Sequence, residues 1–196
     1  MLLRSQVFWL IVVAMVLCNL PQSLSSYHLK LLIVSKDASS ATAAYILSLY
    51  AMGVMAGRFI CGLALDRWSA HVVSAVVMSI PALGLLIFAS DINTIEMVAL
   101  AVLTMGLSQG AEGDLAAYLV FRHFDIGIYG SVLGPIMAAI VSGGALGAGL
   151  LSLVLSLTNQ YTLFLLFTCG TVVMGSGLFL LLGRRSGMVG VDTAPC

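Results

Sequence analysis

Long, unbroken runs of apolar residues are the feature that most restricts what this chain can fold into. Among its 196 residues, 61% are hydrophobic and only 8% are charged, whereas soluble domains are about 45–50% apolar and about 25% charged. Such a chain has too few polar side chains to cover a soluble surface, so we expect an integral membrane protein. The runs are continuous and do not alternate between polar and apolar residues, which indicates membrane-spanning helices and not a β-barrel.

Six of these runs are long enough to cross a bilayer, since a span needs about 20 apolar residues. They cover residues 6–29, 41–65, 71–90, 94–121, 128–157 and 160–182, and the first is interrupted by Pro21 and a mostly polar run at 22–26. We therefore expect an all-α membrane protein in which residues 1–185 form one bundle of six transmembrane helices. The polar, glycine-rich stretch 186–196 is expected to be a disordered cytoplasmic tail.

The basic residues at the ends of the predicted spans indicate how the chain is oriented. An even number of spans places both termini on one side, and the cytoplasmic side carries the excess of Lys and Arg. With cytoplasmic termini, that side holds five arginines and the opposite side holds two lysines. The arginines are Arg4, Arg67, Arg122, Arg184 and Arg185, and the lysines are Lys30 and Lys36. We expect a multi-pass protein of the inner or plasma membrane with both termini in the cytoplasm.

Pairs of glycines four residues apart recur within the predicted spans. They are Gly53/Gly57, Gly106/Gly110, Gly130/Gly134 and Gly143/Gly147. A G-x-x-x-G pair lets two helix backbones approach closely, because no side chain stands between them. We expect most of these pairs to mark close packing between spans.

Three ionisable residues lie deep inside the predicted spans, where charges are costly and therefore point to function. At the helical rise per residue, Arg58 lies roughly 12 Å from the span boundary at Asp66. Glu112 and Asp114 lie roughly 15 Å and 12 Å from the boundary at Arg122. One cation and two carboxylates on two different spans therefore share a depth near the middle of the bilayer.

Two interpretations of these charges remain open. In the first, Arg58 forms a buried ion pair with Glu112 or Asp114 that holds the second and fourth spans together. In the second, Arg58 faces an aqueous cavity and binds an anionic substrate, since a guanidinium stays charged and meets a carboxylate with two parallel hydrogen bonds. Glu112 or Asp114 is then a proton-coupling site or a counter-ion. The two interpretations are compatible, because a substrate can displace an internal carboxylate.

Polar residues around the break in the first span predict a pathway. Asn19 and Gln22 flank Pro21, and His28 lies near the outer end of the same span. A broken helix at mid-depth is tolerated only beside protein or a water-filled cavity. We therefore expect Asn19, Gln22 and His28 to line a polar path.

The sequence "GLALDRW" at 62–68 resembles the loop signature G-x-x-x-D-[RK]-x-G of the major facilitator superfamily, with Ser69 in place of the last Gly. The resemblance implies a gating loop formed by Gly62, Asp66 and Arg67 between the second and third spans. The stretches 8–44 and 110–134 resemble the seventh and tenth helices of that family with the loops that follow them. The chain is thus similar to the C-terminal half of such a transporter, a six-helix unit built as a 3+3 inverted repeat.

The resemblance is greatest to the oxalate/formate antiporter and monocarboxylate porter branches, in which a substrate-binding Arg occupies the position of Arg58 in "AGRFICG". It implies secondary transport of a small organic anion, with a proton as a possible second substrate. The fifth and sixth spans contain no Lys, so a monocarboxylate fits better than oxalate. One half supplies one wall of a transport path, so we expect the chain to require a complementary N-terminal six-helix half or a second copy.

Other function classes have weaker support. A zero formal net charge gives no reason to expect a nucleic acid partner, and the four cysteines have no metal-binding spacing, so no metal or cofactor is expected. An intramembrane protease would need a His near Ser176, but the three histidines lie at span boundaries, so we do not expect an enzyme. The alternative to transport is a non-transporting membrane remnant or scaffold.

Overall fold

The described part of the chain is built from helices. The computed structural model describes residues 5–24, 28–34, 36, 39–90, 92 and 94–186, and no strand occurs among them. In chain order the helices are α1 (Gln6–Asn19), α2 (Leu29–Val34), α3 (Ser40–Arg67), α4 (Ala70–Ala89), α5 (Ile95–His123), the short 3-10 helix η3 (Ile126–Ile128), α6 (Tyr129–Thr158) and α7 (Thr162–Ser186). The predicted all-α class is confirmed. Of the stretch 186–196, predicted to be a disordered tail, Ser186 is the last residue of α7, and 187–196 lie outside the described residues.

Four helices are long and apolar enough to cross a membrane, which fits an integral membrane protein. They cover Ala41–Arg67, Ala70–Ala89, Ile126–Thr158 and Thr162–Gly183. The other two predicted spans differ for separate reasons. α1 has only 14 residues, because it ends at Asn19, just before Pro21 disfavours further helix. α5 has 29 residues but is not among the four, and Gln109, Glu112 and Asp114 interrupt its apolar sequence.

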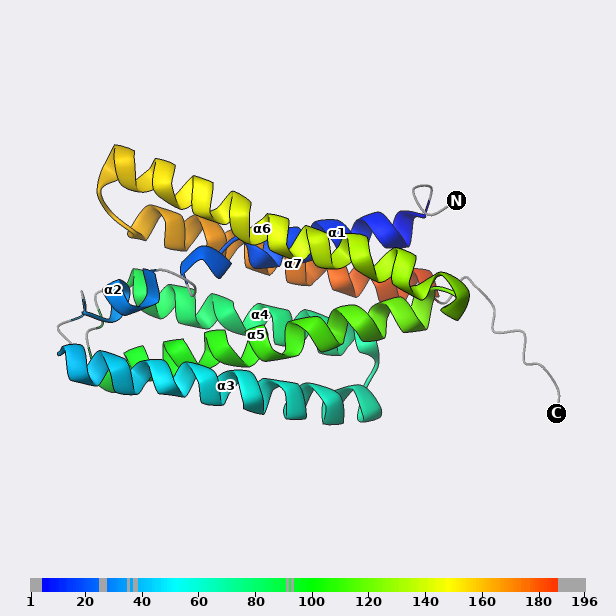
Figure 1. The fold of residues 1–196 in the computed structure, drawn as a ribbon, viewed down its shortest axis with the longest axis horizontal. Coiled ribbons are helices and arrows are strands. Elements are labelled where there is room, and N and C mark those ends of the chain that lie inside the picture. Colours follow the sequence, from blue (N-terminus) through cyan, green and yellow to red (C-terminus); the bar gives the residue numbers. More distant parts are fainter. Residues whose placement is uncertain are drawn as a thin grey trace.

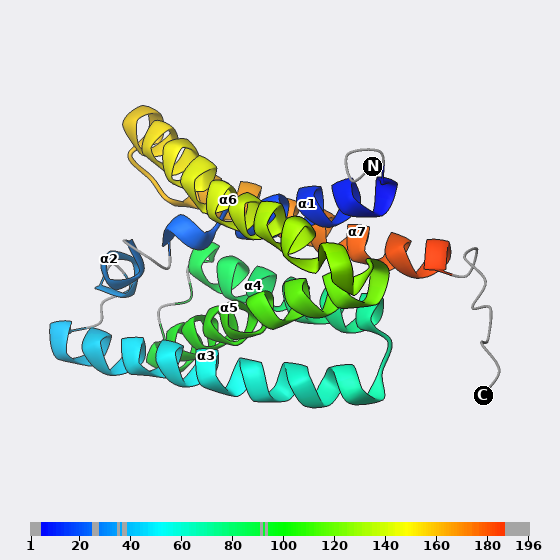
Figure 2. The same ribbon diagram turned by 45° about the vertical axis from the view of Figure 1, so that its right-hand side comes forward.

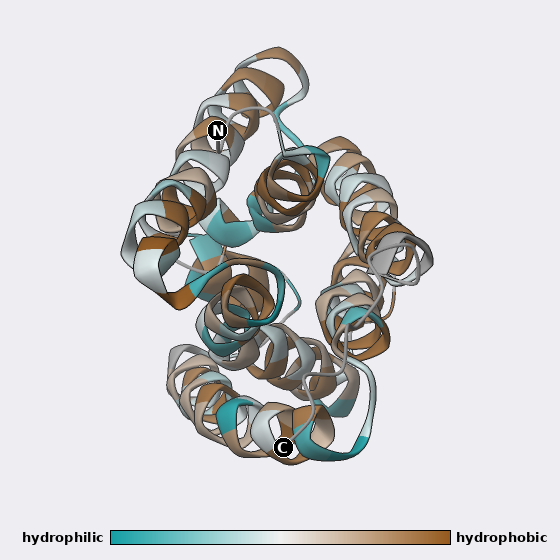
Figure 3. Cartoon of the chain, turned by 90° about the vertical axis from the view of Figure 1, so that its right-hand side faces the viewer, coloured by the Kyte–Doolittle hydropathy of each residue, from teal (hydrophilic) through white to brown (hydrophobic). Residues whose placement is uncertain are grey.

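The long helices run roughly side by side, with α3 and α6 on opposite sides of the helices between them (Figures 1 and 2). α1 begins and α7 ends at the same end of the bundle (Figure 1). Apolar residues predominate along the helical surfaces (Figure 3). Large exposed apolar side chains such as Phe59, Val141 and Leu157, at 74%, 72% and 76% exposure, are what a helix facing lipid requires.

Short polar residues determine where several helices begin and end. The Ser39 hydroxyl accepts a hydrogen bond from the backbone N–H of Thr42 at 3.1 Å and caps the start of α3. The Ser5 hydroxyl does the same for α1, accepting from the N–H of Phe8. At the end of α6, Asn159 adopts the left-handed conformation with φ 54°, which turns the chain into α7.

α3 and α5 pack through the two glycine pairs predicted from the sequence. A Cβ atom on Gly53 would lie 2.8 Å from the carbonyl oxygen of Leu103. A Cβ atom on Gly57 would collide with the carbonyl of Leu107, and one on Gly110 with the carbonyl of Val54. The backbones therefore touch directly, which only glycine permits at these positions.

α1 and α6 pack through the pair Gly143/Gly147 in the same way. A Cβ atom on Gly143 would lie 2.8 Å from the carbonyl oxygen of Val16, and one on Gly147 would collide with the carbonyl of Leu20. The spacing of four residues on both helices equals that of the contacts between α3 and α5. The remaining pair, Gly130/Gly134, has no atom within 4 Å of an added Cβ, so the expected close packing does not occur there.

Two further helix contacts resemble each other in the same way as the α3–α5 and α1–α6 contacts. α4 packs on α5 and α1 packs on α7. A Cβ atom on Gly84 would lie 2.7 Å from the carbonyl oxygen of Ala101, and one on Gly175 would lie 3.0 Å from that of Ala14. α4 and α7 also pack against each other. The α3–α5 and α4–α5 contacts thus correspond to the α1–α6 and α1–α7 contacts, whereas the contacts of α2 with α3 and of α5 with α6 have no comparable counterpart.

Candidate functional site

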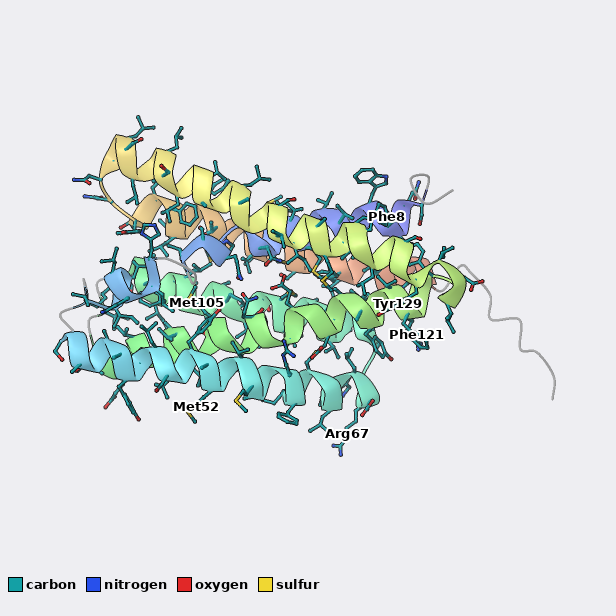
Figure 4. The ribbon with its side chains drawn as sticks, in the orientation of Figure 1. Phe8, Met52, Arg67, Met105, Phe121 and Tyr129 are labelled. Atoms are coloured by element: carbon teal, nitrogen blue, oxygen red, sulfur yellow. The ribbon has the colours of Figure 1, made fainter. Side chains whose placement is uncertain are left out.

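A small polar cavity lies where the end of α1 meets α4 and α5. Its volume is about 30 Å³, which is enough to hold a water molecule. The lining residues are Cys18, Asn19, Pro21, Gln22, Met78, Pro81, Met105, Ser108, Gln109 and Glu112. Met105 points from α5 toward the interior of the bundle (Figure 4). The cavity brings together three of the residues predicted from the sequence: Asn19, Gln22 and Glu112.

Glu112 is the buried acidic group of this cavity, with a side chain only 4% exposed. Its Oε2 atom accepts a hydrogen bond from Nε2 of Gln109 at 3.1 Å. Its Oε1 atom is fully buried and has no hydrogen-bond partner in the structure. Asn19 is 3% exposed, and its Nδ2 atom donates to the carbonyl oxygen of Met15 at 2.9 Å. The Asn19 side chain also lies within hydrogen-bonding reach of the Glu112 carboxylate, so two side-chain amides, those of Asn19 and Gln109, face this acidic group.

Arg58 and Asp114 lie outside this cavity, and both side chains are exposed. Within the described residues, no ion pair joins Arg58 to Glu112 or Asp114. The contact between α3 and α5 is made instead by the glycine backbones described above. The counter-ion role of the two carboxylates therefore stays a prediction.

The packing of α3 on α5 defines the relative heights of the three charges. The two helices run in the same direction, and Cβ of Gly106 would lie 3.3 Å from Cα of Gly53. Counting five residues along each helix from this contact brings Arg58 level with Ala111, next to Glu112. The three charged groups thus lie within about one helical turn of each other in height, with Glu112 inside the bundle and the other two on its surface.

The exposed surface of α3 has two different sides. Ser48, Ala51, Met55, Arg58 and Gly62 recur at steps of three or four residues and form one strip of mostly small or polar exposed side chains. The neighbouring strip is formed by Tyr45, Met52, Phe59 and Leu63, which are 61–74% exposed. Met52 projects away from the bundle (Figure 4). One side of α3 therefore suits lipid, and the side with Arg58 suits water or another polypeptide.

The residues of the predicted gating loop lie at the end of α3. Gly62 has no atom within 4 Å of an added Cβ, and Asp66 and Arg67 are exposed. Arg67 projects away from the other helices (Figure 4). α3 ends at Arg67 with the N–H of Trp68 donating to the carbonyl oxygen of Ala64 at 2.9 Å. The loop is thus a short connection into α4, as its position in the sequence predicts.

The remaining residue of the predicted path, His28, lies beyond the break in the first span. Its Nδ1 atom lies 3.1 Å from the hydroxyl of Tyr161 at the start of α7, with the two rings edge to face at 5.9 Å. His28 and Ser23 line a cavity against α6, and Gln22 and Ser23 line the adjoining one. Gln22 also lines the cavity at Glu112. Gln22 and Ser23 thus line neighbouring cavities between Glu112 and His28, and the path through them stays a prediction.

Sequence reasoning missed two polar residues of the cavity at Glu112. Ser108 and Gln109 precede Glu112 by four and three residues, which is the spacing that places side chains on one face of a helix. That spacing is the feature of the sequence from which both residues could have been predicted to lie beside Glu112. Pro81 also lines the cavity, but nothing in its own sequence context points to a site on α5.

Among the described residues, no group of three or more His, Cys, Asp or Glu side chains is placed to hold a metal ion. The chain matches no protein-family model and no curated protein. The arrangement itself offers a buried carboxylate beside a water-sized cavity, and an exposed guanidinium at a similar height on the neighbouring helix.

Proposed function

We propose that this chain is one six-helix half of a secondary transporter of the major facilitator type, which carries a small organic anion such as a monocarboxylate. The six spans are α3 to α7 together with a broken first span made of α1, the turn that follows it and α2. α5 is about 44 Å long at the helical rise per residue and is therefore long enough to cross the bilayer. Its polar residues are accommodated because Gln109 and Glu112 point into the bundle.

The correspondence between the contacts of the two parts of the chain supports a 3+3 inverted repeat. Exchanging α1, α3 and α4 for α5, α6 and α7 converts the α3–α5 and α4–α5 contacts into the α1–α6 and α1–α7 contacts, and the α4–α7 contact into itself. Three spans are an odd number, so the second set of three begins on the opposite side of the membrane from the first. Such inverted repeats are common in secondary transporters, whose substrate sites lie near the middle of the bilayer.

The exposed guanidinium of Arg58 is the observation that carries the proposal. A charged side chain at this depth faces a bundle interior or a water-filled cavity, because exposure to lipid is costly. Within the described residues Arg58 has no ion-pair partner, so its donors are available for an anion. A carboxylate is the group that a guanidinium binds best, through two parallel hydrogen bonds. Glu112 and Asp114 then act as coupling or counter-ion groups, with a proton as the possible coupled ion.

The side of α3 that carries Arg58 requires a partner in the membrane. We propose that a complementary N-terminal six-helix half, or a second copy, covers this side and completes the path. Asn19, Gln22 and His28 line that path, and Gly62, Asp66 and Arg67 form the gating loop. The protein lies in the inner or plasma membrane with both termini in the cytoplasm, as its arginines indicate.

Uptake of labelled mono- and dicarboxylates tests this function, in vesicles that contain the chain together with a complementary half. We expect Arg58→Lys to lower monocarboxylate uptake about 10-fold or more, because a charge-assisted hydrogen bond contributes about 1.5–3 kcal/mol. Arg122→Lys, an exposed arginine at the end of α5, is the matched control and should retain full uptake. Normal uptake by Arg58→Lys would exclude two-point recognition by Arg58, and no uptake with any partner would favour a remnant or scaffold.

A further inference from the structure

The cavity at Glu112 contains an unbalanced buried charge. None of the residues that line it is Lys, Arg or His, and Glu112 is 4% exposed. An ionised carboxylate in such surroundings is strongly unfavourable unless a positive charge is bound beside it. A protonated carboxyl group would need an acceptor for its O–H, yet Oε1 of Glu112 has no hydrogen-bond partner among the protein atoms. The free oxygen therefore calls for a ligand that the cavity itself can hold.

The groups around the cavity are oxygen donors. The Gln109 amide uses its nitrogen on Glu112, and the Asn19 amide uses its nitrogen on the carbonyl of Met15. Both amides thus keep a carbonyl oxygen for another partner. Ser108 contributes a hydroxyl to the lining. Hard cations take carboxylate, carbonyl, hydroxyl and water oxygens, whereas transition metals in proteins prefer nitrogen and sulfur.

Charge and size select among the hard cations. The cavity offers one carboxylate, whereas Ca²⁺ sites use several. Its volume of about 30 Å³ has room for one small ion or, in its place, one water molecule. One negative charge, several neutral oxygens and a space of this size together match a monovalent cation.

We propose that this cavity is a Na⁺ site, in which Glu112 supplies the charge and the side chains of Asn19, Ser108 and Gln109 supply neutral oxygens. Pro21 and Pro81 border the site, and a proline leaves the carbonyl four residues before it without a helical N–H donor. The role of this ion as the coupled ion of transport rests on the proposed function, whereas its binding does not. The site lies on the path that leads from Glu112 to His28.

Thermal unfolding of the purified chain in detergent tests the site without any transport assay. Unfolding midpoints are compared in NaCl, KCl and choline chloride at equal ionic strength. We expect the midpoint to rise with the logarithm of Na⁺ concentration, by about 5–10 °C when Na⁺ is a hundredfold above its Kd. K⁺ and choline should give no comparable rise. Equal midpoints in the three salts would overturn the proposal.

Two variants of α5 provide the matched comparison. Glu112→Gln keeps the shape and the hydrogen bond to Gln109 but removes the charge, so its midpoint should no longer depend on Na⁺. Glu96→Gln removes an exposed carboxylate at the start of α5 and should keep the full Na⁺ dependence. Ser108→Ala, which deletes one neutral oxygen, should shift the dependence to higher Na⁺ concentrations. Na⁺ dependence that survives Glu112→Gln would contradict the assignment.

The transport assay and the Na⁺-binding assay test the two proposals separately, so either proposal can be contradicted without the other. Na⁺-dependent stabilisation without anion uptake would count against the proposed function and leave the ion site standing. Anion uptake by a chain whose midpoint responds to pH and not to Na⁺ would support transport and overturn the Na⁺ site in favour of a proton.

Discussion

At the level of single residues, the two oxygens of the Glu112 carboxylate have different surroundings. One accepts from Gln109 and the other has no partner. The depth of Glu112 follows from its distance to the end of its span, and this much was predictable. Its burial was not, because neighbouring acidic residues on one helix point in different directions. Asp114 is two residues away and exposed, and only the packing of α4 and α1 on α5 determines which of the two is enclosed.

The contact between His28 and Tyr161 gives a prediction for one hydrogen bond. Tyr161→Phe keeps the edge-to-face ring contact but removes the hydroxyl that lies 3.1 Å from Nδ1 of His28. We expect a loss of stability of about 0.5–1.5 kcal/mol, measured by thermal unfolding in detergent. Tyr45→Phe is the control, because Tyr45 is 68% exposed. Equal stability of Tyr161→Phe and the unmodified chain would mean that the hydrogen bond does not form.

At the level of helices, replacing two different glycines of α5 with alanine should change the stability in opposite directions. Gly110→Ala places a methyl group against the carbonyl of Val54, so α3 and α5 must move apart. We expect the free energy of unfolding to fall by about 1–3 kcal/mol or more, the usual cost of overpacking. Gly113→Ala, three residues on, meets no atom within 4 Å and should be neutral or stabilising by up to about 1 kcal/mol, because alanine favours helix. Equal midpoints for the two variants in an unfolding titration would contradict the close packing.

The corresponding pair in α6 tests whether the two helix contacts are equivalent. Gly147→Ala directs a methyl group at the carbonyl of Leu20, whereas Gly149→Ala meets open space. In the same unfolding assay, Gly147→Ala should lower the free energy of unfolding by about as much as Gly110→Ala does, about 1–3 kcal/mol or more. A neutral Gly147→Ala would show that α1 and α6 can separate without loss, and the repeat would then be only approximate.

Hydrophobic patterning predicted most helices and the interruption of the first span at Pro21, but not the helix beyond it. The run at 6–29 divides as expected, since α1 ends at Asn19, but a separate helix, α2, extends from Leu29 to Val34, past the predicted end of that span. The reason is local, since proline disfavours helix before it and lacks the N–H that would continue the ladder. Whether a proline ends a helix or is absorbed depends on packing. Pro81 and Pro135 both lie inside continuous helices.

At the level of the whole molecule, six spans predict which ends of the helices share a side of the membrane. In a chain with its cysteines replaced, a cysteine at Gln6 and one at Asn159 should react with an impermeant reagent from opposite sides. The start of α1 and the end of α5 lie at the same end of the bundle (Figure 1), so a cysteine at the exposed position Arg122 should react from the same side as Gln6. Labelling of Gln6 and Asn159 from one side would contradict the arrangement of six spans.

The small-residue strip of α3 around Arg58 gives a prediction about assembly. A guanidinium cannot face lipid at this depth without a large cost, so we expect the strip to be covered by protein or water in the membrane. A cysteine at Ala51 should be accessible to a water-soluble reagent, and one at Met52, on the neighbouring strip, should not. Counting photobleaching steps of labelled chains in a bilayer then distinguishes a second copy from a different partner half. Protection of Ala51 in a monomer would place this strip against lipid.

The sequence alone predicted a helical membrane protein, because bilayer thickness and backbone hydrogen bonding leave few alternatives to a chain this apolar, and the four long apolar helices fit this. It also predicted three glycine pairs that form two close helix contacts, α3 with α5 and α1 with α6, since glycine spacing is itself the geometry of the contact. Only the tertiary structure decided that Glu112 is enclosed while Arg58 and Asp114 are exposed. That distinction depends on which face of α5 the end of α1 and α4 cover, and side-chain direction relative to distant helices is not encoded in local spacing.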